Sequence, residues 1–381
     1  MTTIQDLPGI VAGLKKEDKE LFDRFFSVHE SIGHLTLPEE MKPWADKTFG
    51  DHKYLEEQKI VKIFNKQTFE DGLYNDVRSR RPMVVDNNEN LLKDIKEAEG
   101  DNFCHPLTGS PENRFGRVRG KHCVTAANVA KYDSLSGMVI FKKHNPLEVD
   151  RKDVKDYLEV IRKWFAKAHE YNPKAIFPFI MWNCLWRSGG SMIHGHMQMI
   201  LGEEVHYGEP ELLKHLKLEY AEKYNAEFFK DIYQVHESIG LGIRKGDVRI
   251  FTNIVPRKEK EITIFADKFT PEFEDVLYKC VRCLMDDFGV QTFNVGIILP
   301  PLEKVEGWEG FPIYARILDR GDLRNKTTDF GGMEVYARSY LITTTNTYQI
   351  IEKLKEKFEN PIKRLFKRNP KKDSKKSAKK D

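Results

Sequence analysis

The chain has 381 residues, of which 40% are hydrophobic and 32% are charged, and its formal net charge is only +3. This near-neutral balance gives no electrostatic reason to expect a nucleic-acid partner. No apolar run approaches the roughly 20 residues that cross a bilayer, and the start of the chain lacks the pattern of a signal peptide. Five cysteines are too few, and odd in number, for a disulfide framework. We therefore expect a globular, cytoplasmic protein without a membrane partner.

Residues 1–57 are polar and amphipathic, which predicts a helical N-terminal extension. Two short strands are expected around a turn between residues 58 and 85. A loop-rich stretch with Asn, Pro and Gly punctuation then runs to residue 120.

A first folding unit follows this stretch. Residues 136–141 are expected to form a strand, and residues 150–171 carry apolar side chains at helical spacing. Two more strands are predicted at 175–182 and 193–201, and a second helix at 211–231.

A second unit has the same order of elements. A strand is expected at 261–265, a helix at 270–288, and further strands at 292–299 and 311–318. The last strand corresponds to 193–201 but reads Phe-Pro-Ile-Tyr-Ala-Arg, without a histidine. We infer a weak internal repeat of two α+β halves, residues 58–235 and 236–345, with the chemistry kept in the first.

Residues 346–381 close the chain with an amphipathic helix, expected to about residue 368, and a lysine-rich tail. We interpret the tail as solubilising. The alternative is salt-dependent binding to a nucleic acid or an anionic surface.

The residues that point to chemistry lie between 183 and 198, where the sequence reads Asn-Cys-Leu-Trp-Arg-Ser-Gly-Gly-Ser-Met-Ile-His-Gly-His-Met-Gln. On a strand, alternate side chains share a face. His194, His196 and Gln198 would therefore share one face, while Gly195 and Met197 would point into a core. Two imidazoles and an amide beside a glycine loop suit the binding and attack of a phosphate.

The order of residues in this segment resembles the galactose-1-phosphate uridylyltransferase family of the histidine triad superfamily. The residues that carry the resemblance here are Asn183, Gly189, Ser191, His194, His196 and Gln198. Other stretches that are similar to family segments contain Arg78, Arg81, Asn128, His144 and Glu334. The resemblance runs from about residue 58 to about 345. It implies an α+β fold of two histidine-triad-like halves, each an antiparallel sheet with packed helices.

The resemblance also implies roles for these residues. His196 would be the nucleophile, because a neutral imidazole is available near neutral pH. Gln198 and Ser191 would contact the transferred phosphoryl group, together with the backbone N–H groups around Gly189 and Gly190.

The remaining carried-over residues are implied to bind substrate. Arg78 and Arg81 would neutralise phosphate charge, with Arg187 as a third candidate. Asn128 would contact the nucleotide ribose, Asn183 belongs to the phosphate-binding motif, and Glu334 would contact a hexose.

Zinc is the candidate cofactor, because the family can hold it with residues that match His144 and His194, and Cys104 is a third candidate ligand. A complete set of four ligands is not evident in the sequence. The second-half histidines that bind a structural iron in the family have no counterpart. Leu185 stands where the family usually has glycine, and Gly195 stands where the uridylyltransferases usually have proline.

The function implied is a nucleotidyltransferase that moves a nucleoside monophosphate between a nucleotide sugar and a sugar 1-phosphate, through a covalent nucleotidyl-histidine. The alternative with the same chemistry is a phosphorylase of ADP-glucose or of a dinucleoside polyphosphate, in which phosphate is the acceptor. A non-catalytic nucleotide-binding protein is the alternative from another class. Family members often dimerise, so a homodimer is a further expectation.

Overall fold

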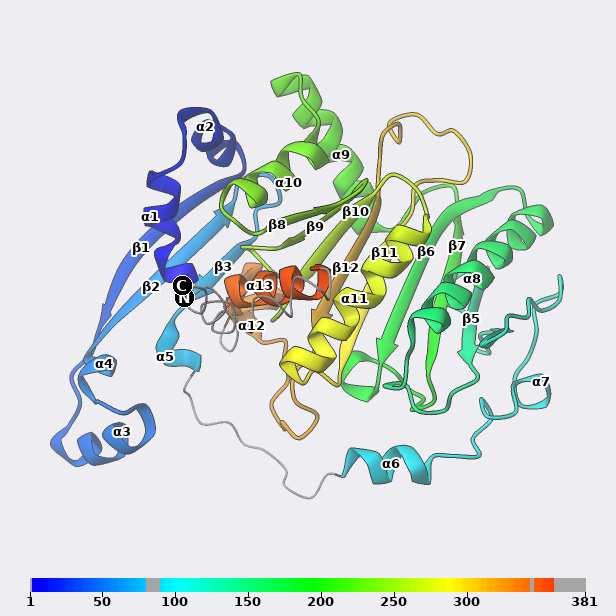
Figure 1. Cartoon of the computed structure of the whole chain (residues 1–381), viewed down its shortest axis with the longest axis horizontal. Coiled ribbons are helices and arrows are strands. Elements are labelled where there is room, and N and C mark those ends of the chain that lie inside the picture. The colour runs from blue at the N-terminus through cyan, green and yellow to red at the C-terminus, as the bar shows by residue number, and fades with distance from the viewer. Residues whose placement is uncertain (1, 80–89, 343–345, 360–381) are drawn as a thin grey trace, which may run out of the picture.

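The computed structural model describes residues 2–79, 90–342 and 346–359. Within these residues the strands form one nine-stranded and one four-stranded sheet (Figure 1). The strands are β1 (Phe26–His34), β2 (Glu57–Asn65), β3 (Asp71–Tyr74), β4 (Cys123–Ala127), β5 (Leu135–Phe141), β6 (Ala175–Cys184), β7 (His196–Glu203), β8 (Gly242–Lys245), β9 (Val248–Thr252), β10 (Ile262–Ala266), β11 (Phe293–Ile298), β12 (Ile313–Asp319) and β13 (Ser339–Ile342).

Helices cover both sheets. The α-helices are α1 (Leu7–Ala12), α2 (Lys16–Phe25), α3 (Lys42–Phe49), α4 (Lys53–Glu56), α5 (Asp76–Ser79), α6 (Leu91–Glu97), α7 (Pro106–Gly109), α8 (Arg151–Tyr171), α9 (Gly208–Tyr224), α10 (Phe228–Ser238), α11 (Pro271–Phe288), α12 (Gly332–Ala337) and α13 (Thr347–Phe358). The 3-10 helices are η1 (Ile4–Asp6), η2 (Glu39–Met41) and η3 (Trp186–Ser188).

The large sheet confirms the internal repeat. Its strand order is β4-β5-β7-β6-β11-β12-β10-β9-β8, and every neighbouring pair is antiparallel. The first four strands therefore recur in mirrored order in the next four. The two halves can be matched residue by residue if Asn128, after β4, is taken as equivalent to Asn253, after β9. The pairing registers of the strands then make Gln198 equivalent to Arg316.

The two halves meet at the pair β6 and β11, in the middle of this sheet. Met181 of β6 lies directly opposite Gly296 of β11, and the same registers make these two residues equivalent. A pseudo-two-fold axis therefore passes between them.

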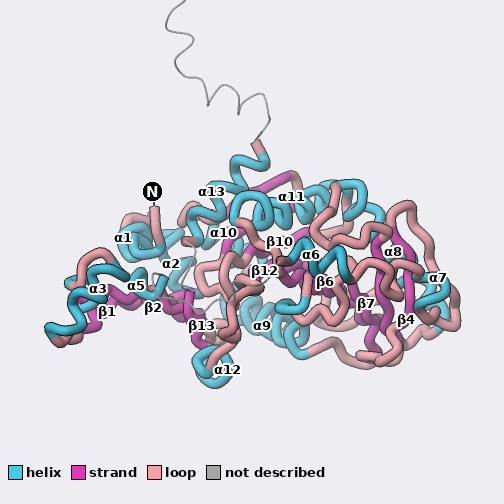
Figure 2. Tube along the Cα trace, turned by 90° about the horizontal axis from the view of Figure 1, so that it is seen from below, coloured by secondary structure: helices cyan, strands magenta, loops and turns pink. Residues whose placement is uncertain are grey.

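Helices α8 and α11 are the equivalent long helices of the two halves. They lie side by side across one face of the sheet, with α13 against α11, while α9 and α12 lie on the other side (Figures 1 and 2). Helix α8 begins with a capping box of Asp150 and Asp153, and α11 begins with Thr270, whose hydroxyl accepts from the N–H of Phe273. The buried apolar stripes of both helices form the main core with the strands beneath them.

The four-stranded sheet corrects two sequence predictions. The segment 1–57, expected to be helical, contains strand β1, which pairs with β2 along its whole length. The order β1-β2-β3-β13 joins strands assigned to the first half with a strand assigned to the second. The boundaries at 58, 235 and 345 therefore do not coincide with the sheets.

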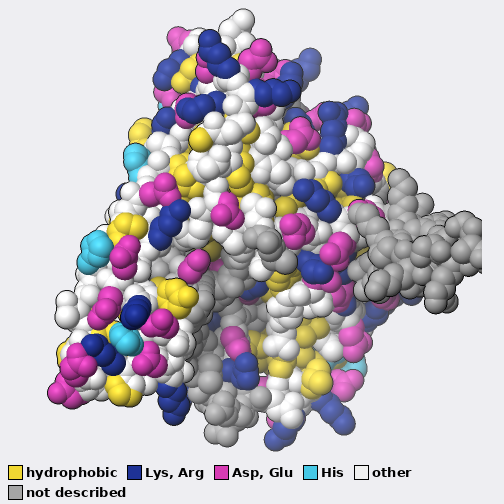
Figure 3. Space-filling model, turned by 60° about the vertical axis from the view of Figure 1, so that its left-hand side comes forward, with side chains coloured by type: hydrophobic (Ala, Val, Ile, Leu, Met, Phe, Trp, Pro, Cys, Tyr) yellow, Lys and Arg dark blue, Asp and Glu magenta, His cyan; other side chains and the backbone are white. Residues whose placement is uncertain are grey.

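Helix α13 confirms the first part of the predicted C-terminal helix and ends at Phe358. Residues 360–381, which include the rest of that prediction and the lysine-rich tail, lie outside the described residues. In the described part of the chain no helix is long and apolar enough to span a membrane. The face shown in Figure 3 mixes basic and acidic side chains, as the small net charge leads one to expect.

Candidate functional site

Strand β7 has the two faces that its sequence predicts, although it begins at His196 and not at residue 193. Met197 and Met199 are buried in the main core. His196 and Gln198 point to the opposite face, and the ring of Phe103 lies 5.4 Å from the His196 ring. The alternation is therefore confirmed from His196 to Met199, whereas His194 precedes the strand. Phe103 is a neighbour that the sequence did not reveal.

His196 is held in one tautomer. Its Nδ1–H donates to the backbone carbonyl of His194 at 2.9 Å, and because a carbonyl oxygen only accepts, the proton must be on Nδ1. Its Nε2 then carries a lone pair, and no partner for this atom is found among the described residues. Burial lowers the pKa of His196, which favours the neutral imidazole.

Two asparagines share this face of the sheet with Gln198. The β6–β7 register ends at Met181 opposite Gln198. Because β6 runs on to Cys184 and β7 starts at His196, the same register continued by two residues would set Asn183 opposite His196. Asn128 follows β4 on the same side, by the alternation of β4 against β5. The Oδ1 of Asn128 and the Oε1 of Gln198 are buried and have no described hydrogen-bond partner. The face thus brings together motif residues with unused polar atoms, as expected of a binding surface.

The glycine loop joins β6 to β7. The N–H of Gly189 donates to the carbonyl of Trp186 at 2.9 Å, and the N–H of Gly190 donates to the carbonyl of Leu185 at 3.1 Å. These two N–H groups therefore close the loop and are not free to hold a phosphate, which corrects the prediction for them. Ser191, with an exposed side chain, follows directly.

Leu185 begins this loop with φ 66 and ψ 173. Such a conformation is almost restricted to glycine and costs another residue about 1–3 kcal/mol. The side chain of Leu185 is only 1% exposed in the main core. The chain therefore keeps a glycine-like backbone at this position and gains buried apolar contact from the leucine.

Gly195 has a packing explanation of its own. A Cβ at this residue would lie 2.4 Å from Cδ2 of Phe141, whose ring stacks on Tyr157 with centroids 3.9 Å apart. Phe141 therefore fills the space that a proline ring would need.

Arg187 uses three of its five N–H groups in hydrogen bonds to backbone carbonyls. Its Nε donates to the carbonyl of Arg320 at 2.8 Å, and its Nη1 and Nη2 donate to the carbonyls of Asn325 and Thr327. Its guanidinium ties the glycine loop to the loop after β12.

The predicted metal ligands lie together and gain a fourth. His144, His194 and Cys104 form a cluster with Asp101, and one ligand atom from each lies within 4.8 Å of the others. Asp101 precedes Cys104 by three positions, which is the spacing of a Cys-x-x-Cys pair. This spacing is the signal that the sequence analysis missed.

The two imidazoles of this cluster are oriented for a cation. Nε2 of His144 lies 2.7 Å from the carbonyl of Ile95, and Nε2 of His194 lies 2.8 Å from the carbonyl of Phe141. Both Nε2 atoms therefore carry protons, and the two Nδ1 lone pairs face one another at 3.1 Å. Burial also lowers the pKa of His194. Two N donors, a thiol and a carboxylate fit a tetrahedral zinc ion.

Two substrate-binding predictions are not joined to this site by described contacts. No hydrogen bond, ion pair or ring contact among the described residues links Arg78 or Glu334 to the surroundings of His196. Arg78 lies in α5, and its Nε is buried without a described partner. Glu334 caps its own helix and lies 3.7 Å from Lys258. Arg81 lies outside the described residues.

The equivalent position in the second half has no histidine. The registers carry His196 onto Tyr314 and Gln198 onto Arg316. The guanidinium of Arg316 lies 3.2 Å from Glu261 and 3.7 Å from Glu209. Internal ion pairs thus occupy the place of the catalytic motif, which agrees with chemistry kept in the first half.

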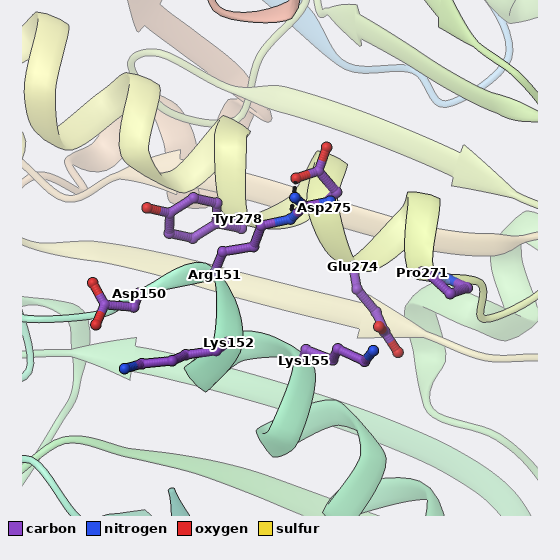
Figure 4. A pocket seen from close by; sticks show the side chains of 8 residues that line it. All are labelled: Asp150, Arg151, Lys152, Lys155, Pro271, Glu274, Asp275 and Tyr278. Carbon is purple, nitrogen blue, oxygen red and sulfur yellow. Dashed lines mark ion pairs between the residues drawn. The ribbon is translucent and has the colours of Figure 1, made fainter.

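A groove of about 720 Å³ lies between the first turns of α8 and α11, away from the face of His196 (Figure 4). Arg151 from α8 and Asp275 from α11 form an ion pair across it at 2.6 Å. Its lining mixes both charges, and none of the predicted site residues belongs to it.

The chain resembles solved structures, although its sequence matches no protein-family model and no curated protein. An ADP-glucose phosphorylase from Arabidopsis thaliana, solved with bound ADP-glucose, superposes with a TM-score of 0.58 at 13% identity, over 75% of this chain and 95% of that chain. A GalT-like protein from the same plant gives a TM-score of 0.56 at 14% identity, over 68% and 92% of the two chains.

A uridylyltransferase gives a TM-score of 0.52 at 15% identity, over 65% of this chain and 88% of that chain. These likenesses confirm, at the level of the fold, the resemblance seen in the sequence. The chain has the α+β architecture of these proteins, with two related halves.

Proposed function

We propose that the protein is a nucleotidyltransferase that moves a nucleoside monophosphate from a nucleotide sugar to a sugar 1-phosphate through a covalent nucleotidyl-His196. The observation that carries this proposal is the single tautomer of His196, in which Nδ1–H is bound to the carbonyl of His194 and Nε2 keeps its lone pair. The fold shared with a uridylyltransferase agrees with it.

In the first step Nε2 of His196 attacks the α-phosphorus. A P–N bond forms as the P–O bond to the sugar phosphate breaks, and the sugar phosphate leaves as a stable anion that needs no proton. In the second step an oxygen of the acceptor phosphate attacks the same phosphorus, and the P–N bond breaks to return neutral His196.

The neighbours of His196 would stabilise the charge on the transferred group. Gln198 and Asn183 would donate amide N–H groups to the phosphoryl oxygens, and Ser191 would add its hydroxyl. Asn128, with its unpartnered Oδ1, would accept from a ribose hydroxyl. Arg78, Arg81 and Glu334 stay predictions for the remaining phosphate and sugar contacts.

We further propose that Asp101, Cys104, His144 and His194 hold a zinc ion with a structural role. The facing lone pairs of the two histidines support this assignment. Bound zinc would supply a fixed positive charge and a tie between the loop before α7 and the end of β5. Phe103, which contacts His196, lies between two of these ligands in sequence.

A phosphorylase is the second candidate, because the superposed structure with a TM-score of 0.58 is an ADP-glucose phosphorylase. The first step would be unchanged. Inorganic phosphate would replace the sugar 1-phosphate as the acceptor in the second.

Intact-mass measurements after separate incubation with UDP-glucose, ADP-glucose and diadenosine tetraphosphate test the proposal. We expect an adduct of the size of UMP or AMP that His196→Asn cannot form. His215→Asn is the matched control, because His215 lies on α9 with an exposed side chain and an ion pair to Glu219. The absence of an adduct with all three compounds contradicts the covalent mechanism, and release of the adduct by phosphate alone identifies a phosphorylase.

A further inference from the structure

A chain of polar side chains from the second half ends beside His196. Asn183 of β6 lies directly opposite Asn294 of β11, and the Nδ2 of Asn294 donates to the Oδ1 of Asn183 at 2.6 Å. Nη1 of Arg320 donates to the Oδ1 of Asn294 at 2.6 Å. Asp329 holds the same guanidinium through Nε at 2.6 Å and Nη2 at 3.2 Å.

The orientation of the Asn294 amide is fixed from both sides. A guanidinium only donates, so the atom of Asn294 that faces Arg320 must be the oxygen. On the other side, Nδ2 of Asn294 also donates to the backbone carbonyl of Ser188 at 2.9 Å. A flipped amide would set oxygen against the Ser188 carbonyl and NH₂ against the guanidinium, and both contacts would be lost.

This orientation passes to Asn183. Because Asn294 offers it an N–H, Asn183 must turn its oxygen toward Asn294 and its NH₂ group away. The Nδ2 of Asn183 has no hydrogen-bond partner among the described residues and lies 4.0 Å from where a Cβ on Gly189 would stand. Continuing the β6–β7 register two residues past Met181 and Gln198 would set Asn183 opposite His196. A donor beside the nucleophile suits a phosphoryl oxygen, whereas a carbonyl oxygen at the same place would repel it.

We propose that Asn294 and Arg320 are positioning residues that fix Asn183 as a hydrogen-bond donor toward the phosphate of the nucleotide. This inference rests on the proposed function, because it assigns a partner to the amide of Asn183. It gives the second half, which lacks the catalytic motif, a part in the reaction.

Asn294→Asp is the informative variant, because a carboxylate can only accept. Asn183 must then turn its NH₂ toward Asp at 294 and its oxygen toward the site. The first-step rate at saturating nucleotide sugar, measured by the appearance of the covalent adduct, should fall about 100-fold, the scale on which one lost donor acts. The affinity for UMP or AMP, measured by calorimetry, should fall about tenfold.

Three further variants separate positioning from general damage. Asn294→Asp should have no additional effect in an Asn183→Ala background, because the amide that Asn294 orients is then absent. Arg320→Lys keeps a donor for the Oδ1 of Asn294 and should retain most of the rate. Gln291→Glu, which adds a negative charge at an exposed residue near β11, should behave as wild type. Thermal unfolding of each variant shows that the fold is retained.

Equal rates and affinities in wild type and Asn294→Asp overturn the inference, as does an undiminished effect in the Asn183→Ala background. If wild type binds UMP or AMP but forms no adduct, the covalent mechanism fails. The comparison of nucleotide affinities between wild type and Asn294→Asp then still tests whether Asn294 orients Asn183. If wild type binds neither nucleotide, both the proposed function and the positioning role of Asn294 and Arg320 are contradicted.

Discussion

Individual residues around the site are constrained by the local backbone and by packing against the core. The backbone carbonyl of His194 holds the proton of His196 on Nδ1, so Nε2 keeps its lone pair. Residue 195 must be glycine because the ring of Phe141, stacked on Tyr157, fills the space of a side chain. Neither constraint involves the substrate. The local backbone therefore fixes the tautomer of His196, and packing against the core explains the glycine at 195.

Gly195→Ala should lower stability by about 1–3 kcal/mol, the usual cost of overpacking a core. The new methyl group would lie 2.4 Å from Phe141 Cδ2, which cannot move without leaving the Tyr157 ring. Urea unfolding measures the loss. Gly208→Ala is the matched control, since its Cβ would meet nothing within 4 Å. Equal unfolding midpoints for the two variants would contradict this packing account.

The pH dependence of the first step should report the buried nucleophile. Burial lowers the pKa of His196, so the neutral form persists below pH 6.5, the ordinary value for histidine. The rate of adduct formation should therefore be flat from pH 8 to 6.5 and fall only at lower pH. Single-turnover mass measurements across pH 5–8 test this. A decline that begins above pH 6.5 would mean that the nucleophile is solvated.

Among the elements, the segment from α6 to α7 depends most on the proposed metal. His144 at the end of β5 reaches the carbonyl of Ile95 in α6, and Asp101 and Cys104 follow in the next loop. Short helices with few buried residues are weak folding units by themselves. A cation shared by these loops would hold Phe103 against His196.

Purified protein should contain about one zinc ion per chain, and Asp101→Ala should lose most of it because a tetrahedral site needs its fourth ligand. Asp101→Cys should retain the metal. Elemental analysis gives the zinc content, and limited proteolysis after chelation should show faster cleavage between residues 95 and 105.

Asp46→Ala is the matched control, because Asp46 belongs to a second, more exposed group of possible ligands with Asp51 and His52. Equal zinc contents in Asp101→Ala and Asp46→Ala would show that Asp101 is not a zinc ligand.

At the scale of the whole molecule, the halves are joined in more than one layer. The strands β6 and β11 pair in the sheet, and Arg151 pairs with Asp275 between α8 and α11. Buried histidines contribute to this shared core. His206 is 4% exposed and His236 is fully buried.

Stability should decrease as the pH falls from about 6.5 to about 4. Burial lowers the pKa of both His206 and His236 to about 4. Between these values the unfolded chain binds protons that the folded chain does not, so each histidine costs up to about 3 kcal/mol of stability at pH 4. Above pH 6.5 these two histidines should no longer make the folding stability depend on pH.

Urea midpoints measured from pH 8 to 4 check this prediction. His236→Gln cannot titrate, so its stability should fall less steeply than that of wild type between pH 6.5 and 4, whatever its effect on absolute stability. An unchanged slope in the variant would show that other groups cause the acid sensitivity.

The sequence was sufficient to predict those elements and site residues whose pattern lies within a short stretch of chain. The alternation around His196, the apolar spacing of α8 and α11, and the repeat of strands were all visible in short windows. Strand β1 was not, because most of its residues are polar and Glu30 interrupts the alternation of Phe26, Val28 and Ile32. Asp101 was missed although its spacing to Cys104 was readable. Asn294 and Arg320 could not be found, because Asn294 contacts Asn183 across 111 positions of sequence and Arg320 acts on Asn183 only through Asn294.

The pseudo-two-fold axis between Met181 and Gly296 has a consequence for ancestry. In an isologous dimer the same patch meets itself across the symmetry axis, and β6 and β11 meet in that way. A single ancestral half could thus have paired with its twin through this strand before duplication and fusion joined the two genes. In the fused chain the second half has Tyr314 and Arg316 at the positions equivalent to His196 and Gln198, so one nucleophile would serve both halves.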